Sequence, residues 1–123
     1  LNTHMLRLAE VYLNLAEAIL GNDASTADPT ALFYYNKVRT RAGMPTKATN
    51  EAITYEDLRY ERRIELALEG HRFFDLIRAD KVVPGYAEKM MKAHGKTNFS
   101  IAKHATFFIP QKQVDISQGV LKN

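Results

Sequence analysis

Residues 61–78, ERRIELALEGHRFFDLIR, decide the interpretation of this chain, because acids and bases recur there at helical spacing among large apolar side chains. Glu61, Glu65 and Glu69 are four residues apart and would share one face of a helix. Arg62 precedes Glu65 by three residues, so opposite charges can relieve the repulsion between the glutamates. Such a pattern is typical of a solvated face, a buried ion-pair network or a set of metal-ligating carboxylates.

The apolar residues of this stretch favour the buried network. Eight leucine, isoleucine and phenylalanine residues between positions 58 and 77 exceed the narrow stripe of a surface helix, so we expect the charged face to lie partly against protein. Gly70 supports this, since a glycine inside a helix costs about 1 kcal/mol relative to alanine, and close approach of another backbone would explain it. The predicted network is structural scaffold and comprises Arg7, Glu10, Glu17, Arg39, Arg41, Glu61, Arg62, Glu65, Glu69, Arg72 and Asp75.

The sequence lacks the spacings that metal and catalytic sites need. No Asp or Glu has a His three positions later, there is no cysteine and no His-Glu-x-x-His, and the four histidines are scattered. Neither Gly-x-Ser-x-Gly nor Gly-x-Gly-x-x-Gly occurs. We therefore expect no enzymatic activity, no metal and no cofactor.

Length and composition suit one small globular domain. The 123 residues are 46% hydrophobic, carry a net charge of +3 and include no apolar run of about 20 residues that could span a membrane. The lysines do not alternate with aromatic residues, so we expect no nucleic-acid partner. We predict a single all-α domain over 1–123, with a helical hairpin over 1–45, a long charged helix over 54–80 and an irregular tail over 81–123.

The first half of the chain predicts two helices. Residues 5–20 are apolar except for a single narrow stripe, which predicts a helix enclosed on most sides. The polar residues of the stripe are Arg7, Glu10, Asn14 and Glu17. Asp28 as N-cap, with Pro29 at the first helical position, predicts a second helix to about Ala42. The pair resembles one tetratricopeptide-like unit, and a capping box at Thr54 starts the long charged helix.

Three blocks of the chain, in order, resemble the C-terminal part of SusD/RagB-family proteins. They are RLAEVYLNLAEA (7–18) with NKVRTRAG (36–43), ERRIELALEGHRFFDLIR (61–78) and FFIPQKQVDISQGVLKN (107–123). The resemblance implies a surface-exposed lipoprotein of the bacterial outer membrane, held by a lipid anchor that this sequence does not contain. It implies binding of a glycan or other nutrient, and a SusC-like TonB-dependent transporter as partner. The alternative is a helical-repeat adaptor that binds a peptide in its groove.

The resemblance assigns no ligand-binding residue, because the aromatic and polar groups of such sites come from distant segments. Four aromatic residues are candidate stacking platforms, although a core role is the simpler expectation: Tyr34, Tyr35, Tyr86 and Phe99. The apolar residues 107–109 are expected to pack onto the helices. The first helix has more apolar surface than this chain can cover. We therefore expect either self-association as a dimer, through a face that includes Leu6, Leu13 and Leu20, or marginal stability.

Overall fold

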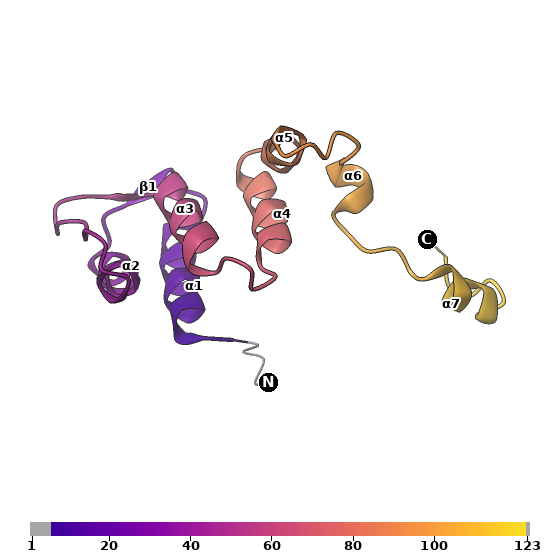
Figure 1. Cartoon of the computed structure of the whole chain (residues 1–123), viewed down its shortest axis with the longest axis horizontal. Helices are drawn as coiled ribbons and strands as arrows, with labels where there is room; N and C mark the ends of the chain where they lie inside the picture. The colour runs from indigo at the N-terminus through magenta and orange to yellow at the C-terminus, as the bar shows by residue number, and fades with distance from the viewer. Residues whose placement is uncertain (1–5, 123) are drawn as a thin grey trace. The chain divides into compact units, whose positions relative to one another are not determined.

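The computed structural model describes residues 6–122 and confirms the all-α fold class (Figure 1). Its only strands in that range are two residues long and pair antiparallel, with Ser25 opposite Thr54 and Thr26 opposite Ile53. The elements are α1 (Leu8–Leu20), β1 (Ser25–Thr26), α2 (Pro29–Arg41), β2 (Ile53–Thr54), α3 (Tyr55–Glu65), α4 (Arg72–Val82), α5 (Tyr86–Ala93), α6 (Ile101–His104) and α7 (Gln111–Ile116).

The chain divides into two compact units, Leu1–Asp75 and Leu76–Asn123. The expectation of one domain over 1–123 stays a prediction. The first unit contains α1, α2 and α3, and the second contains most of α4 together with α5, α6 and α7.

Helix α1 is the centre of the first unit and packs against both α2 and α3. Its buried residues are Ala9, Leu13, Ala16 and Leu20, at the spacing of three and four that places side chains on one helix face. Small residues at two of these positions let the neighbouring helices approach closely. The predicted start at Met5 lies outside the described residues, and the helix begins at Leu8.

Side-chain caps start α2 and α3, as the sequence predicts. Asp28 Oδ1 accepts hydrogen bonds from the backbone N–H groups of Thr30 and Ala31, at 2.8 and 3.1 Å. Thr54 Oγ1 accepts from the N–H of Asp57 at 3.0 Å, and Asp57 Oδ2 accepts from the N–H of Thr54 at 2.9 Å. Such caps satisfy N–H groups that have no partner inside the helix, and each stabilises by about 1 kcal/mol.

The single long helix predicted over 54–80 is wrong, because residues 66–71 interrupt it. Leu68 and Gly70 have left-handed backbone angles, with φ of 66° and 81°, which no α-helix accommodates. The charged spacing therefore continues through a stretch that is not helical. Arg7 stabilises the end of α3 from outside, since its Nη2 donates to the backbone carbonyl of Glu65, one of the acceptors that a helix C-terminus leaves open.

Gly70 is used for its backbone angle rather than for close packing. Apart from Gly70 itself and its two chain neighbours, no residue has a heavy atom within 4 Å of the position that a Cβ would occupy there. The close backbone approach inferred from the sequence is therefore wrong, and the left-handed φ explains the glycine instead.

The second unit has a small core and local polar contacts. Leu76, Ala79, Ala87 and Phe99 are buried, and Asp80 Oδ1 accepts from the N–H of Ala87 at 2.8 Å. The predicted packing of the tail onto the helices is wrong for two phenylalanines, since residues 107 and 108 are 79% and 65% exposed. The tail expected to be irregular over 81–123 contains three short helices, α5, α6 and α7.

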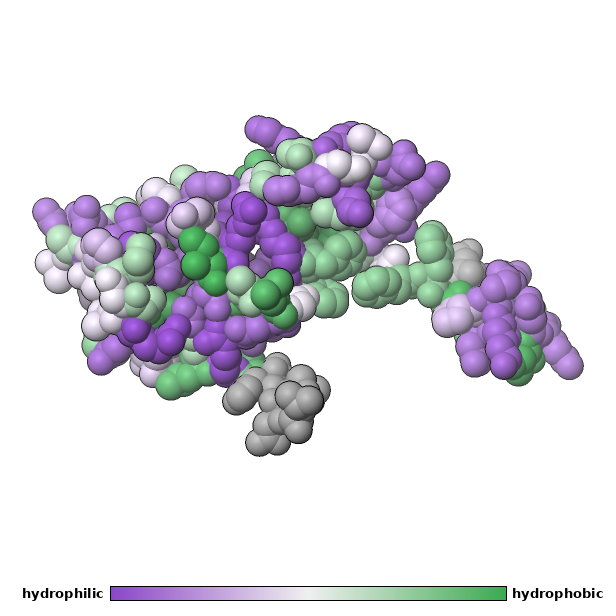
Figure 2. Space-filling view, viewed as in Figure 1, coloured by the Kyte–Doolittle hydropathy of each residue, from purple (hydrophilic) through white to green (hydrophobic). Residues whose placement is uncertain are grey.

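Part of α1 faces solvent. Leu8, Val11 and Leu15 are 62%, 42% and 38% exposed and lie on one side of the helix, and Figure 2 shows hydrophobic patches among the hydrophilic surface of this unit. Leu13 and Leu20 are 0% and 1% exposed. The apolar surface expected on this helix is present, but the face named from the sequence is wrong at these two leucines.

Candidate functional site

A first cluster of charges joins the start of α1 to the end of α3. Arg7 Nη1 lies 2.8 Å from Glu65 Oε1, and Arg7 Nε lies 2.7 Å from Glu69 Oε2. Arg41 Nη2, from the end of α2, lies 2.7 Å from the same Glu65 carboxylate, whose side chain is 5% exposed. The hydrogen bond to Glu69 is the main reason that the pKa of Arg7 is raised. Arg7 thus stays charged and ties α1 to the segment that follows α3.

A second cluster surrounds Arg62, a charged residue that is only 3% exposed. Its Nη2 lies 3.0 Å from Asp75 Oδ1, its Nη1 donates to Asn14 Oδ1 at 2.5 Å, and its Nε lies 3.7 Å from Glu17 Oε2. A buried guanidinium needs such partners, because burying an uncompensated charge is costly. Within the first unit, one arginine of α3 therefore contacts both α1 and Asp75, the last residue of that unit.

A third cluster connects α2 and α3. Arg39 Nη1 lies 2.6 Å from Glu61 Oε2, and Arg39 Nε donates to the Pro45 carbonyl at 2.6 Å. Burial alone would lower the pKa of Arg39, but its hydrogen bond to Glu61 and the nearby Tyr35 raise it. Burial also raises the pKa of Tyr35 to about 12, so this phenol stays protonated beside the ion pair.

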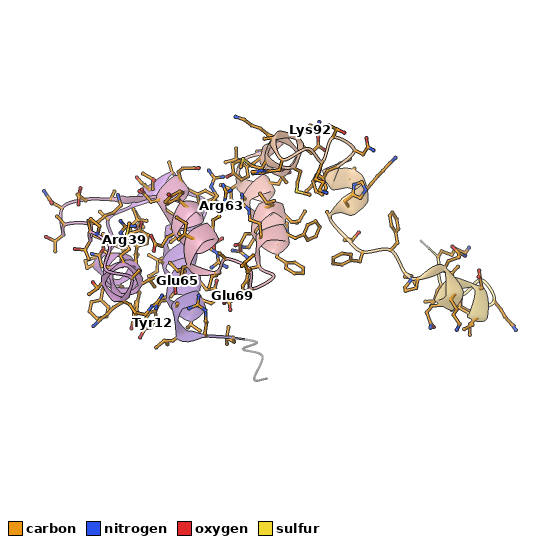
Figure 3. All side chains as sticks on the ribbon, in the orientation of Figure 1. Tyr12, Arg39, Arg63, Glu65, Glu69 and Lys92 are labelled. Atoms are coloured by element: carbon orange, nitrogen blue, oxygen red, sulfur yellow. The ribbon has the colours of Figure 1, made fainter. Side chains whose placement is uncertain are left out.

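The structure places the predicted members of the network in these three clusters, except for Glu10 and Arg72. Arg72 makes no ion pair with any residue in the range 6–122, whereas Glu10 Oε1 lies 3.6 Å from His71 Nδ1. Figure 3 labels Arg39, Glu65 and Glu69, which lie on α2, at the end of α3 and in the segment that follows it. The expected pairs at helical spacing are wrong, because Arg62 and Glu65 turn toward other helices. The scaffold role of the network stays a prediction.

The sequence did not identify Asn14 and His71 as members of these clusters. Asn14 belongs to the polar stripe of the first helix, alternating with Glu10 and Glu17, and that position was the available signal. No pattern in the sequence marks His71 as a member. It contacts Glu10 of α1 and follows the non-helical segment in which Leu68 and Gly70 have left-handed backbone angles.

Residues 6–122 contain no candidate metal-binding site. No group of three or more His, Asp or Glu side chains there is arranged to hold a metal ion. In the same range, no helix is both long and apolar enough to cross a membrane.

A groove lies on the outer side of α2, between that helix and the loop that follows it. Its volume is about 560 Å³, within the range of small-molecule sites. Phe33, which is 54% exposed, forms an edge-to-face pair with Tyr34, and the Tyr34 ring lies 4.8 Å from that of Tyr12. The lining residues are Pro29, Leu32, Phe33, Asn36, Lys37, Thr40 and Thr49.

Sequence reasoning missed this groove. The spacing of Phe33 and Lys37, one turn apart on α2, was the available signal. Among the four aromatic residues considered from the sequence, Tyr35 and Phe99 are buried, and Tyr34 and Tyr86 are half-buried. None of the four lines the groove.

Comparison with known proteins identifies the family. The chain is 40% identical over 84 residues to a SusD-like protein of Bacteroides ovatus, a match that covers 68% of this chain and 15% of that relative. No solved structure was found to match. The chain thus spans a small part of the length of the curated relative that it matches. The model of the SusD family matches residues 2–123, and the chain belongs to the SusD family.

Proposed function

We propose that this chain is part of a non-enzymatic protein that binds glycans or other nutrients at the bacterial cell surface. The match of the SusD family model to residues 2–123 carries this proposal. In the whole protein, binding would precede uptake through a SusC-like TonB-dependent transporter. The proposed location is the outer membrane, with a lipid anchor and exposure to the outside of the cell.

The role proposed for residues 6–75 within that protein is scaffold. The three charge clusters join α1, α2 and α3 through Arg7, Arg62 and Arg39, each of which contacts carboxylates from another part of the chain. Ion pairs that are this enclosed fix the arrangement of helices more than they add net stability. A rigid arrangement would let loops and helix faces hold a nutrient without a large ordering cost.

The test uses the whole protein in its native bacterium. We expect it in the outer-membrane fraction, degraded when intact cells are treated with protease, and co-purified with a large TonB-dependent transporter. Affinity electrophoresis should show retardation by a polysaccharide, with no release of reducing ends on prolonged incubation. Recovery of the protein in the cytosolic fraction, protected from protease, would overturn the proposed location and partner.

A further inference from the structure

The groove on α2 is bounded by a loop that hydrogen bonds attach to the helix, and these bonds do not use the side chains of Phe33, Lys37, Thr40 and Thr49 that line the groove. The Asn36 side chain makes two hydrogen bonds to the backbone of Lys47, donating to its carbonyl at 2.8 Å and accepting from its N–H at 2.9 Å. Arg39 holds Pro45 in the same loop. Three hydrogen bonds therefore attach the loop to α2. The groove is therefore defined by specific contacts among residues 29–49.

The rim offers a ring, a cation and hydroxyl groups. Phe33, Lys37 and Thr40 are spaced by four and three residues and share the outer face of α2, and Thr49 faces them from the loop. Lys37 Nζ lies 5.0 Å from the centre of the Phe33 ring. A flat apolar face can stack on the ring, a carboxylate can bind the ammonium, and the threonine hydroxyls can donate or accept.

We propose that this groove binds an acidic sugar, a hexuronate unit of a glycan, with its ring on Phe33 and its carboxylate on Lys37. The inference rests on the proposed nutrient-binding function and narrows its ligand class. A pyranose ring combines a C–H face for stacking, hydroxyls for Thr40 and Thr49, and in a hexuronate one carboxylate.

A peptide fits the groove less well, because its backbone would find few partners in the loop. The N–H groups of Met44, Lys47 and Ala48 are already bonded within the protein, as are the carbonyl groups of Pro45, Lys47 and Ala48. Pro29, which also lines the groove, has no N–H to offer. The side chains on the rim, by contrast, offer a ring, an ammonium group and hydroxyls, and their chemistry matches a sugar with a carboxylate.

Binding would move Lys37. Its contact with the exposed Phe33 ring is a weak interaction, and a charge-assisted hydrogen bond to a carboxylate is stronger. A hexuronate would draw the ammonium away from the ring and uncover the face on which the sugar stacks. A neutral sugar would have to displace Lys37 without that compensation. The groove therefore discriminates by charge.

The experiment measures binding of trigalacturonate and of its fully methyl-esterified form to the 123-residue chain, by NMR titration. We expect the acid to bind and the ester to bind about tenfold more weakly. Lys37→Gln should weaken binding of the acid about tenfold, and Phe33→Ala about fivefold, whereas Lys37→Arg retains it. Tyr60→Ala and Lys89→Gln are the matched controls, because both residues are exposed and lie outside the groove. Circular dichroism verifies that every variant is folded.

Equal binding of acid and ester, or binding unaffected by both groove variants, would overturn the inference. Tighter binding of an acidic peptide than of trigalacturonate, lost in Phe33→Ala, would assign the groove to peptides and overturn it too. A neutral glycan panel run in parallel on the whole protein separates the two proposals. If the whole protein binds such a glycan while trigalacturonate fails, the groove inference is wrong and nutrient binding stands.

Discussion

Replacing Arg62 by alanine should destabilise the first unit more than any other single change in the charge clusters. The side chain is 4% exposed and makes hydrogen bonds to Asp75 and Asn14, with Glu17 at 3.7 Å. Removing one partner of a buried ion pair costs about 3 to 5 kcal/mol. Asp75 and Glu17 are 11% and 19% exposed, so water recovers part of this cost. We expect the free energy of unfolding to fall by about 3 kcal/mol, at the lower end of that range.

Urea unfolding followed by circular dichroism measures this change, and Arg72→Ala is the matched control. Arg72 belongs to the same sequence block but makes no ion pair within the described residues, so its loss should cost no more than about 0.5 kcal/mol. A double-mutant cycle of Arg62→Ala with Asp75→Asn should give a coupling energy of about 1 to 2 kcal/mol. Equal losses for Arg62→Ala and Arg72→Ala, or no coupling, would refute the reasoning and indicate a merely solvated face.

Three further predictions concern backbone angle, pH and association. Gly70→Ala should cost about 1 to 2 kcal/mol because φ is 81°, whereas Leu68→Gly, at φ of 66° and fully exposed, should stabilise in urea melts. Tyr35 stays protonated when folded up to about pH 12, and its unfolded pKa is near 10, so stability should fall between pH 10 and 12, by up to about 3 kcal/mol. Tyr35→Phe should lose that component of the pH dependence. Val11→Glu should reduce self-association in sedimentation experiments, because it places a charge on the exposed apolar side of α1, and an unchanged sedimentation profile would contradict this.

Local signals in the sequence predicted helix starts and inward faces. Asp28 and Thr54 cap α2 and α3 as expected, because a cap depends only on residues within three positions of it. Tyr35 is buried on α2, which agrees with the core role expected for it. Glu61, Arg62 and Glu65 do form ion pairs, since large charged side chains among many apolar ones need partners.

The partners within the network could not be read from spacing. Glu65 lies three residues from Arg62, but it pairs with Arg7 and Arg41, which are 58 and 24 positions away in sequence. Helical periodicity cannot predict such contacts, because they depend on how the helices pack against one another. Periodicity also continued through Leu68, whose left-handed backbone is costly for a leucine and has no signature in the sequence.

The two sides of α2 connect the network with the groove. Tyr35, Val38 and Arg39 face the protein, where Arg39 pairs with Glu61, and Phe33 and Lys37 face outward. Because Arg39 also holds Pro45, the same guanidinium links α3, α2 and the loop that forms one wall of the groove. Weakening that link should therefore widen the groove without touching its rim. Arg39→Lys should lower the affinity of the groove for a hexuronate, because the loop that forms its wall is no longer held in place. The chemical shifts of Phe33 and Lys37 in the free protein should change little.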